Sequence, residues 1–360
     1  MEVDVQGAVE DDNPPSPKTK VFLPGRHILS KDEILEPDQS AYELLHRMNV
    51  AWPCLSFDIL RDGLGDESRK YPMTAFAVTG TQADQTNKNE VLVLKMSSLH
   101  RTQKDDGRSL TLSHRSLLSC GPSEIRAEMT IILIGDSASE EEDDEEDLDE
   151  NAVLESRSLP HVGGVNRIRA QPLPTLPASS LPYHVATWAE TGKVHIFNIR
   201  QFLESLDTSG CTFDREKASK PVYTITAHGR SEGFAMDWAA STNGLRLLTG
   251  DITSKIYLTT TTASGFNTMQ NPFTSHTSSV EDLQWSPSEP TVFASCSADQ
   301  SIRIWDVRVK GRKSVMAVER AHDSDVNVIS WNRNSTTAYL LVSGGDEGNL
   351  KIWDMRSWKP

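Results

Sequence analysis

The sequence predicts an all-β protein made of about five similar units, because its segments repeat and each repeat reads as strands and turns. His276 and His322 lie 46 positions apart. Trp305 and Trp353, each followed by an aspartate, lie 48 positions apart. Short runs of alternating apolar and polar residues, bounded by Gly, Asp, Ser and Asn, are typical of strands joined by turns. We expect the units at roughly 55–100, 160–200, 222–262, 276–308 and 322–356.

A histidine early and a Trp-Asp pair late in each complete unit are the signature of WD-repeat β-propellers. In that repeat a carboxylate holds the imidazole, and the indole N–H reaches a serine oxygen. A catalytic triad would use similar residues, but this set recurs at a fixed period, so we interpret it as structural. In other units Glu347, Thr253 and Thr191 stand where the aspartate would align. The best preserved unit has the full set at His276, Ser295, Asp299 and Trp305.

Before the first unit, residues 26–54 are expected to form a helical segment that packs on the side of the propeller. Apolar residues, including Tyr42 and Leu45, recur there at helical spacing. Pro53, directly after Trp52, would end the helix. The simplest role of these apolar side chains is packing.

Residues 139–150 read SEEEDDEEDLDE, and this acidic tract supplies −10 of the formal net charge of −15. Such side chains repel one another and have no apolar surface to bury, so the tract cannot belong to a packed core. A polyanion of this kind could hold a basic protein, and the alternative is a solubilising loop. Its carboxylates belong to Glu140, Glu141, Glu142, Asp143, Asp144, Glu145, Glu146, Asp147, Asp149 and Glu150.

Composition excludes several classes of function. The rest of the chain carries a net charge of only −5, without the Lys and Arg clusters that direct nucleic-acid binding needs. The four cysteines lack metal-ligand spacing, and no apolar stretch approaches the roughly 18 residues of a membrane span. The N-terminus has no secretory pattern. We therefore expect a soluble intracellular protein without catalytic activity, cofactor or metal.

Several motifs resemble the glutamate-rich WD-repeat proteins of ribosome assembly. They are the WP-x-LSFD element from Trp52, the acidic loop, and ESRSLPHVGGVNRIRAQ at 155–171. Histone-binding WD-repeat subunits of chromatin complexes share the N-terminal helix and the WP element. The resemblance covers roughly residues 20–106 and 136–356. It implies a chaperone that captures a newly made, basic large-subunit ribosomal protein (number three) in the cytoplasm and escorts it to the nucleus and nucleolus.

The chain departs from that family at two places. Residues 107–135 separate RTQKDD from the acidic tract and end in an apolar MTIILI run, which would be a β-prone liability if unpaired. They are either a real loop or extra sequence from a splice variant or gene model. The family also continues past the fifth unit to a closed ring of seven blades. We therefore expect a shortened propeller over residues 55–360, with an inserted loop at 101–158. Residues 1–25 are expected to be a disordered N-terminal segment.

Two further functions stay open at this point. A histone chaperone would use the same layout and the same acidic loop. A substrate receptor of a cullin-type ubiquitin ligase is the other, because Arg308 and Arg356 complete W-D-x-R patterns by which some propellers dock a ligase adaptor. The simpler interpretation is that both arginines form surface ion pairs. Ser137 and Ser139 each precede an acidic residue by three positions, a pattern that acidophilic kinases prefer.

Overall fold

The structure is a computed structural model. It describes residues 22–23, 26–30, 35, 41–62, 70–102, 127–133, 151–173, 181–208, 210–241 and 244–357, with backbone alone at 127–133 and 240–241. The acidic tract, Ser137 and Ser139 lie outside these residues.

Five antiparallel sheets follow one another along the chain, and we name them blades 1 to 5. Blade 1 contains β2 (Cys54–Leu60), β3 (Met73–Thr81), β4 (Glu90–Leu99) and β6 (Val153–Pro160). Blade 2 contains β7 (Val165–Ala170), β8 (His184–Ala189), β9 (Val194–Asn198) and β10 (Tyr223–Ile225). Blade 3 contains β11 (Ala235–Ser241), β12 (Gly244–Gly250), β13 (Ile256–Thr262) and β14 (Gly265–Thr268). Blade 4 contains β15 (Val280–Trp285), β16 (Val292–Ser297), β17 (Ile302–Asp306) and β18 (Met316–Val318), and blade 5 contains β19 (Val326–Trp331), β20 (Leu340–Gly345) and β21 (Leu350–Asp354).

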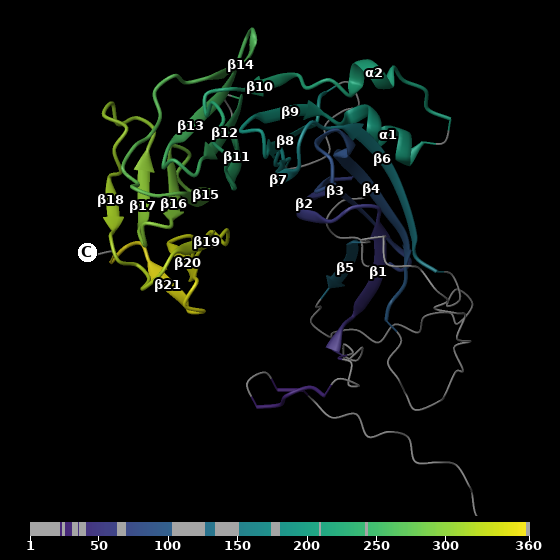
Figure 1. The fold of residues 1–360 in the computed structure, drawn as a ribbon, viewed down its shortest axis with the longest axis horizontal. Coiled ribbons are helices and arrows are strands. Elements are labelled where there is room, and N and C mark those ends of the chain that lie inside the picture. Colours follow the sequence, from purple (N-terminus) through teal and green to yellow (C-terminus); the bar gives the residue numbers. More distant parts are fainter. Residues whose placement is uncertain are drawn as a thin grey trace, which may run out of the picture.

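The first strands of the five blades, β2, β7, β11, β15 and β19, lie beside one another in chain order (Figure 1). Among the described strands, no comparable contact joins β19 back to β2, so the blades form an open arc. The predicted all-β architecture is therefore confirmed. The described helices are α1 (Arg200–Asp207), α2 (Arg215–Ala218) and a 3-10 turn at Thr86–Lys88.

Apolar side chains pack between neighbouring blades. One cluster joins blades 1 and 2, and three others join blades 2 and 3, 3 and 4, and 4 and 5. Each buried aliphatic side chain contributes about 1.5–3 kcal/mol, so a blade is stabilised mainly by its neighbours. Gly80 shows how close they approach, because a Cβ there would lie 2.4 Å from the Val165 side chain of blade 2. A Cβ at Gly250 would meet Val280 of blade 4 at 2.7 Å.

Both ends of the arc expose apolar side chains. On β2, Phe57 and Ile59 are 58% and 60% exposed. On β21, Leu350 and Ile352 are 76% and 72% exposed. Blades at the ends of an arc lack one neighbouring blade and are expected to show such surfaces.

The expected N-terminal helix is wrong over residues 44–50. These residues form strand β1 (Leu44–Val50), which pairs antiparallel with β5 (Ala127–Leu133) in the 107–135 segment. Leu44 and Met48 are buried against blade 1, and their spacing fits either conformation, because residues four apart share one face of a helix and also of a strand. The backbone partner supplied by β5 therefore decides the conformation, and the β-prone run is not unpaired.

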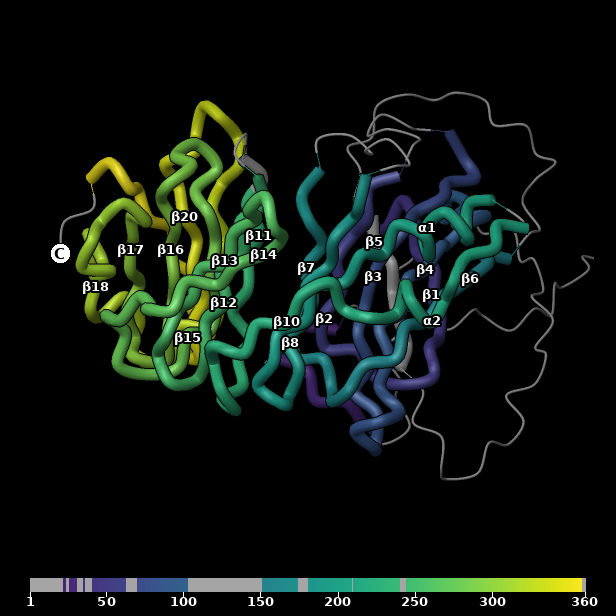
Figure 2. Tube along the Cα trace, turned by 90° about the horizontal axis from the view of Figure 1, so that it is seen from above, coloured from purple at the N-terminus to yellow at the C-terminus, as the bar shows by residue number. Residues whose placement is uncertain are grey.

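Helices α1 and α2 lie on the outer side of blade 1, beside β6 (Figures 1 and 2). Cations from blade 1 satisfy carbonyl groups at the C-terminal end of α1, where cations are favourable. Lys95 Nζ donates to Leu206 O at 3.1 Å, and Arg157 Nη2 donates to Ser205 O at 3.1 Å. Among the described residues, no helix is long and apolar enough to cross a membrane.

Candidate functional site

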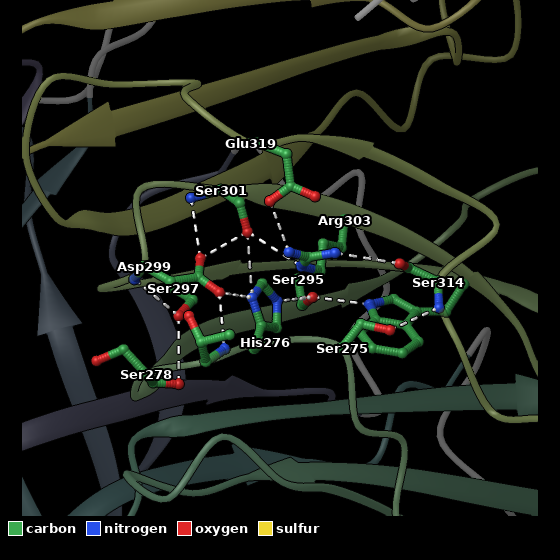
Figure 3. A network of polar contacts seen from close by, with 12 residues as sticks. Ser275, His276, Ser278, Ser295, Ser297, Asp299, Ser301, Arg303, Ser314 and Glu319 are labelled. Atoms are coloured by element: carbon green, nitrogen blue, oxygen red, sulfur yellow. Dashed lines mark hydrogen bonds and ion pairs between the residues drawn. The ribbon is translucent and has the colours of Figure 1, made fainter.

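The structure brings together the four residues of the blade 4 network, His276, Ser295, Asp299 and Trp305. Figure 3 labels the first three of them. Trp305 Nε1 donates to Ser295 Oγ at 2.8 Å. The Ser295 hydroxyl is 2.6 Å from His276 Nε2, and the other ring nitrogen is 2.8 Å from Asp299 Oδ2. Because the carboxylate only accepts, His276 Nδ1 carries the proton and Ser295 donates to Nε2.

Electrostatics and access both favour a structural role for this network. Burial lowers the pKa of His276, although Asp299 opposes the shift. Burial alone would raise the pKa of Asp299, but hydrogen bonds from His276 and Ser301 hold it well below its usual range. Ser295 is 0% exposed, so no substrate can reach its hydroxyl. The arrangement orders a blade and offers no accessible nucleophile.

In blades 3 and 5 the corresponding histidine is also held between a hydroxyl and a carboxylate, but the hydroxyl is Thr249 in blade 3 and Ser343 in blade 5, and only blade 5 adds a tryptophan N–H. In blade 3 the expected position, Thr253, does not supply the partner of His228; Asp251 does so from two residues earlier, at 2.7 Å. Thr253 instead donates to Asp251 at 2.8 Å. In blade 5, Glu347 binds His322 as the alignment indicates. The sequence signal for the histidine partner in blade 3 was Asp251, which directly follows Gly250 at the end of β12.

Among blades 2 to 5, blade 2 has the least complete network. His161 Nε2 is 3.0 Å from Thr187 Oγ1, and a backbone carbonyl, Gly163 O, replaces the carboxylate at 2.8 Å. The buried Trp188 Nε1 and Thr191 Oγ1 have no hydrogen-bond partner among the described residues. In blade 2 a backbone carbonyl, and not another side chain, therefore takes the place of the carboxylate that holds the histidine.

A second set of aspartates connects neighbouring blades, and sequence reasoning missed it. Each lies on the first strand of a blade and accepts a backbone N–H from the first strand of the next blade. A recurring aspartate within that apolar strand was the available signal. The contacts join Asp58 Oδ2 to Ala170 N at 2.8 Å, Asp237 Oδ2 to Trp285 N at 2.7 Å, and Asp282 Oδ2 to Ile329 N at 3.2 Å.

These aspartates line a cavity of about 460 Å³ together with Arg169 and Arg333. Burial raises the pKa of Asp237 to about 7, and the nearby Asp282 adds to the shift while the two arginines oppose it. Burial also raises the pKa of Asp58 and of Asp282. The cavity therefore combines carboxyl groups whose pKa values are raised with the guanidinium groups of two arginines.

The remaining predicted site residues lie in separate places. Tyr42 and Leu45 are half-buried beside blade 1, and Leu45 N donates to Thr102 Oγ1 at 2.7 Å. Trp52 is half-buried, with Lys88 Nζ 5.8 Å from its ring centroid. Pro53 O accepts from Gln82 N at 2.8 Å.

The acidic tract ends three residues before β6, the outermost strand of blade 1, so the sequence connects its C-terminal end directly to that strand. The described residues contain no group of His, Cys, Asp and Glu side chains that could hold a metal ion.

Arg308 and Arg356 are exposed, and each is bound to the aspartate of its own W-D-x-R pattern. Arg308 Nη2 lies 2.6 Å from Asp306 Oδ2, and Arg356 Nη2 lies 2.7 Å from Asp354 Oδ2. This pairing supports the surface ion-pair interpretation. Adaptor docking stays a prediction.

We expect replacement of both arginines by alanine to leave the fold unchanged and adaptor association unaltered. Each guanidinium already has its own carboxylate partner, so it is less free to bind another protein. Co-purification of a cullin-ligase adaptor with the wild type and with R308A/R356A tests this. A tenfold or larger loss of adaptor in the variant would contradict it.

Family models match two parts of the chain. The model that describes the histone-binding protein RBBP4 and its equivalent in the CAF1 complex matches residues 32–100. The WD domain, G-beta repeat model matches residues 267–306 and 313–354, which cover most of blades 4 and 5.

Three relatives are similar over most of this chain. Ribosome assembly protein rrb1 of Schizosaccharomyces pombe is 41% identical over 321 residues, which is 89% of this chain and 59% of the relative. Glutamate-rich WD repeat-containing protein 1 of Dictyostelium discoideum is 40% identical over 289 residues, covering 80% of this chain and 54% of the relative. Protein HEAT STRESS TOLERANT DWD 1 of Arabidopsis thaliana is 36% identical over 392 aligned positions, covering 95% of this chain and 78% of the relative.

The chain spans a little over half the length of the first two relatives and more than three quarters of the third. The WD networks, the propeller blades and the identity to these relatives agree. The chain belongs to the family of glutamate-rich WD-repeat proteins that includes the ribosome assembly protein of Schizosaccharomyces pombe, and this family is related to the histone-binding WD-repeat proteins.

Proposed function

We propose that this protein is a non-enzymatic chaperone for ribosome assembly. Its client would be a newly made, strongly basic large-subunit ribosomal protein (number three), captured in the cytoplasm and released in the nucleolus. The observation that carries the proposal is the 41% identity to a ribosome assembly protein. The acidic tract in the loop before β6 agrees with a basic client.

Two parts of the molecule would divide the work of binding. The ten carboxylates of the acidic tract neutralise Lys and Arg clusters that would otherwise bind RNA nonspecifically. Each exposed ion pair contributes only about 0–1 kcal/mol, so the sum matters and depends on salt. Charge alone selects poorly, and the propeller would add specific contacts. Phosphorylation of Ser137 and Ser139 would add about −1.5 to −2 charges each and strengthen capture.

Replacing every Glu of 140–150 by Gln and every Asp by Asn should weaken client binding by about 10- to 100-fold at low salt. The change removes charge while it preserves length and polarity. Binding of the purified ribosomal protein is measured at KCl concentrations from about 50 to about 500 mM, over which the screening of exposed charges increases. The difference between variant and wild type should shrink as salt rises.

A scrambled tract with the same composition is the matched control. It should bind as the wild type does, because a summed charge depends little on residue order. Equal affinity and an equal salt slope for the neutralised and wild-type proteins would exclude the tract from the binding mechanism.

Histone binding is the second candidate, because the histone-binding family model matches residues 32–100. This range includes β1 to β4. A competition experiment separates the two clients: histones H3–H4 and the ribosomal protein are offered together at equal concentration. Recovery of the histones in place of the ribosomal protein would favour the second candidate.

A further inference from the structure

Ser314 lies directly after a basic run, in the loop that joins β17 to β18 of blade 4. Residues 308–313 read RVKGRK, so four of these six residues are cationic, and the apolar Val315 follows the serine. A serine preceded by basic residues and followed by an apolar residue is the pattern that basophilic protein kinases prefer. The sequence therefore singles out the Ser314 hydroxyl as a candidate acceptor for such a kinase.

The loop around Ser314 lies at the surface. Lys310, Lys313 and Val315 are exposed, and Ser314 itself is half-buried. The side chains of Arg312 and Lys313 donate to two carbonyl groups of the segment that follows β14, and both contacts are open to solvent. Exposed hydrogen bonds of this kind exchange readily with water, so local opening of the loop gives a kinase access to residues 310–315.

The Ser314 hydroxyl already contacts a buried cation. Arg303 Nη1 donates to Ser314 Oγ at 3.3 Å (Figure 3). Arg303 is 8% exposed, and its other two nitrogens donate to Ser301 Oγ at 3.1 Å and to Glu319 Oε2 at 2.8 Å. A guanidinium group has five N–H donors, so two remain beyond these three contacts. Because the group is shielded from water, it attracts an anion more strongly than an exposed arginine does.

Glu319, the carboxylate that Arg303 binds in this structure, is held only at its tip. The Glu319 side chain is 70% exposed, whereas that of Arg303 is 9% exposed, so the glutamate regains water when it moves away. A phosphate on Ser314 would carry about −1.5 to −2 charges and three strong acceptor oxygens. It would therefore bind Arg303 more strongly than a single carboxylate and would repel Glu319.

We propose that Ser314 is a phosphorylation site and that Arg303 binds the phosphate in place of Glu319. In the reaction, Ser314 Oγ attacks the γ-phosphorus of ATP, the new O–P bond replaces the bond to the β-phosphate, and ADP leaves. The catalytic carboxylate of the kinase takes the hydroxyl proton. Since Ser301, which Arg303 also contacts, donates to Asp299, the phosphate would connect the surface loop to the buried network of blade 4.

Incubation of the folded protein with ATP and the catalytic subunit of cyclic-AMP-dependent protein kinase, a basophilic kinase, tests the site. We expect Ser314 to be phosphorylated at a rate within about tenfold of that of the isolated peptide 308–319, because only the loop has to open. Mass spectrometry locates the phosphate, and Ser314→Ala should remove it from this peptide. Ser288 is the internal control, because it is exposed on the same blade but follows no basic residue, so it should stay unmodified.

The melting temperature tests the role of Arg303. Phosphorylation should raise the Tm of the wild type by about 2–4 °C, because it adds charge-assisted hydrogen bonds to a buried cation. Arg303→Lys should lose most of this rise, because lysine lacks the planar fork of donors. Glu319→Gln should show a rise at least as large as the wild type, because the competing carboxylate is gone. The phosphorylated and unphosphorylated forms of each variant are compared with each other, which removes the effect of the substitution itself.

Each failure overturns a definite part of the proposal. An unmodified peptide would overturn recognition of the basic run, and a modified peptide beside an unmodified folded protein would overturn the site. An equal rise in Tm for Arg303→Lys, or a smaller rise for Glu319→Gln than for the wild type, would overturn the exchange of phosphate for carboxylate on Arg303.

Discussion

Replacing Trp305 by alanine is expected to lower the free energy of unfolding by about 3–5 kcal/mol. The side chain is 0% exposed. Its ring stacks on Phe293 at 5.7 Å between centroids and 8° between planes, and meets Phe273 edge-on at 5.7 Å. Truncation would leave a large cavity between blades 3 and 4 and would remove the indole N–H that Ser295 accepts. Urea unfolding followed by far-UV circular dichroism measures the loss.

Two variants separate packing from hydrogen bonding. Trp305→Phe keeps most of the apolar area and removes the donor, so it should cost about 1–2 kcal/mol. Trp353→Ala is the matched control, because its indole donates to Ser343 at the same 2.8 Å but the side chain is only half-buried. Its cost should be smaller than that of Trp305→Ala. Equal costs at the two positions would show that burial does not determine the contribution of this tryptophan.

The repeat pattern was sufficient to predict the fold class, because each repeated residue type has one physical role. A histidine, a serine and a tryptophan at fixed spacing can satisfy one another only inside a blade, and blade 4 has that geometry. Position alone was insufficient in blade 3. The Asp251 carboxylate reaches His228 as well as a carboxylate at the aligned position, Thr253, would. An alignment of the repeats by position does not show that a residue two places earlier can fill the same role.

The N-terminal segment was mispredicted because its partner is distant in the sequence. Leu44 and Met48 fit one face of a helix and one face of a strand equally well, so local spacing cannot decide between them. The deciding interaction is the ladder to residues 127–133, more than 75 positions away. The aspartates between blades were missed for a similar reason. The aspartate recurs within the first strands, but each is bound by the next blade, and its own strand does not identify that partner.

Replacing Asp237 by asparagine is expected to stabilise the protein at pH 8.5 by about 2 kcal/mol. In the folded state burial and Asp282 raise the pKa of Asp237 from 3.8 to about 7. Such a change corresponds to about 4 kcal/mol, and we expect about half of it because solvent reaches the cavity. Asparagine carries no charge, and its oxygen can still accept the Trp285 N–H. Urea unfolding of both proteins between pH 5 and pH 8.5 measures the difference.

The sign follows from where the proton is lost. The unfolded chain releases the Asp237 proton near pH 3.8 and the folded protein releases it near pH 7. Between these values the folded state binds more protons, so the stability of the wild type falls as pH rises and levels off above about pH 7. The advantage of Asp237→Asn should therefore grow from pH 5 to pH 7 and then stay constant. Burial lowers the pKa of His184 and of His195 to about 4, which acts in the opposite direction but equally in both proteins.

Asp299→Asn is the control with the opposite sign. Its pKa is held below the usual range by His276 and Ser301, so its charge stabilises the folded state. The substitution should cost about 1–3 kcal/mol near pH 7, and the cost should diminish as pH falls. A pH-independent effect of Asp237→Asn, or a loss of stability at pH 8.5, would contradict a raised pKa at this position. The pair of variants thus distinguishes a carboxyl group whose pKa is raised by burial from one that a blade needs as an anion.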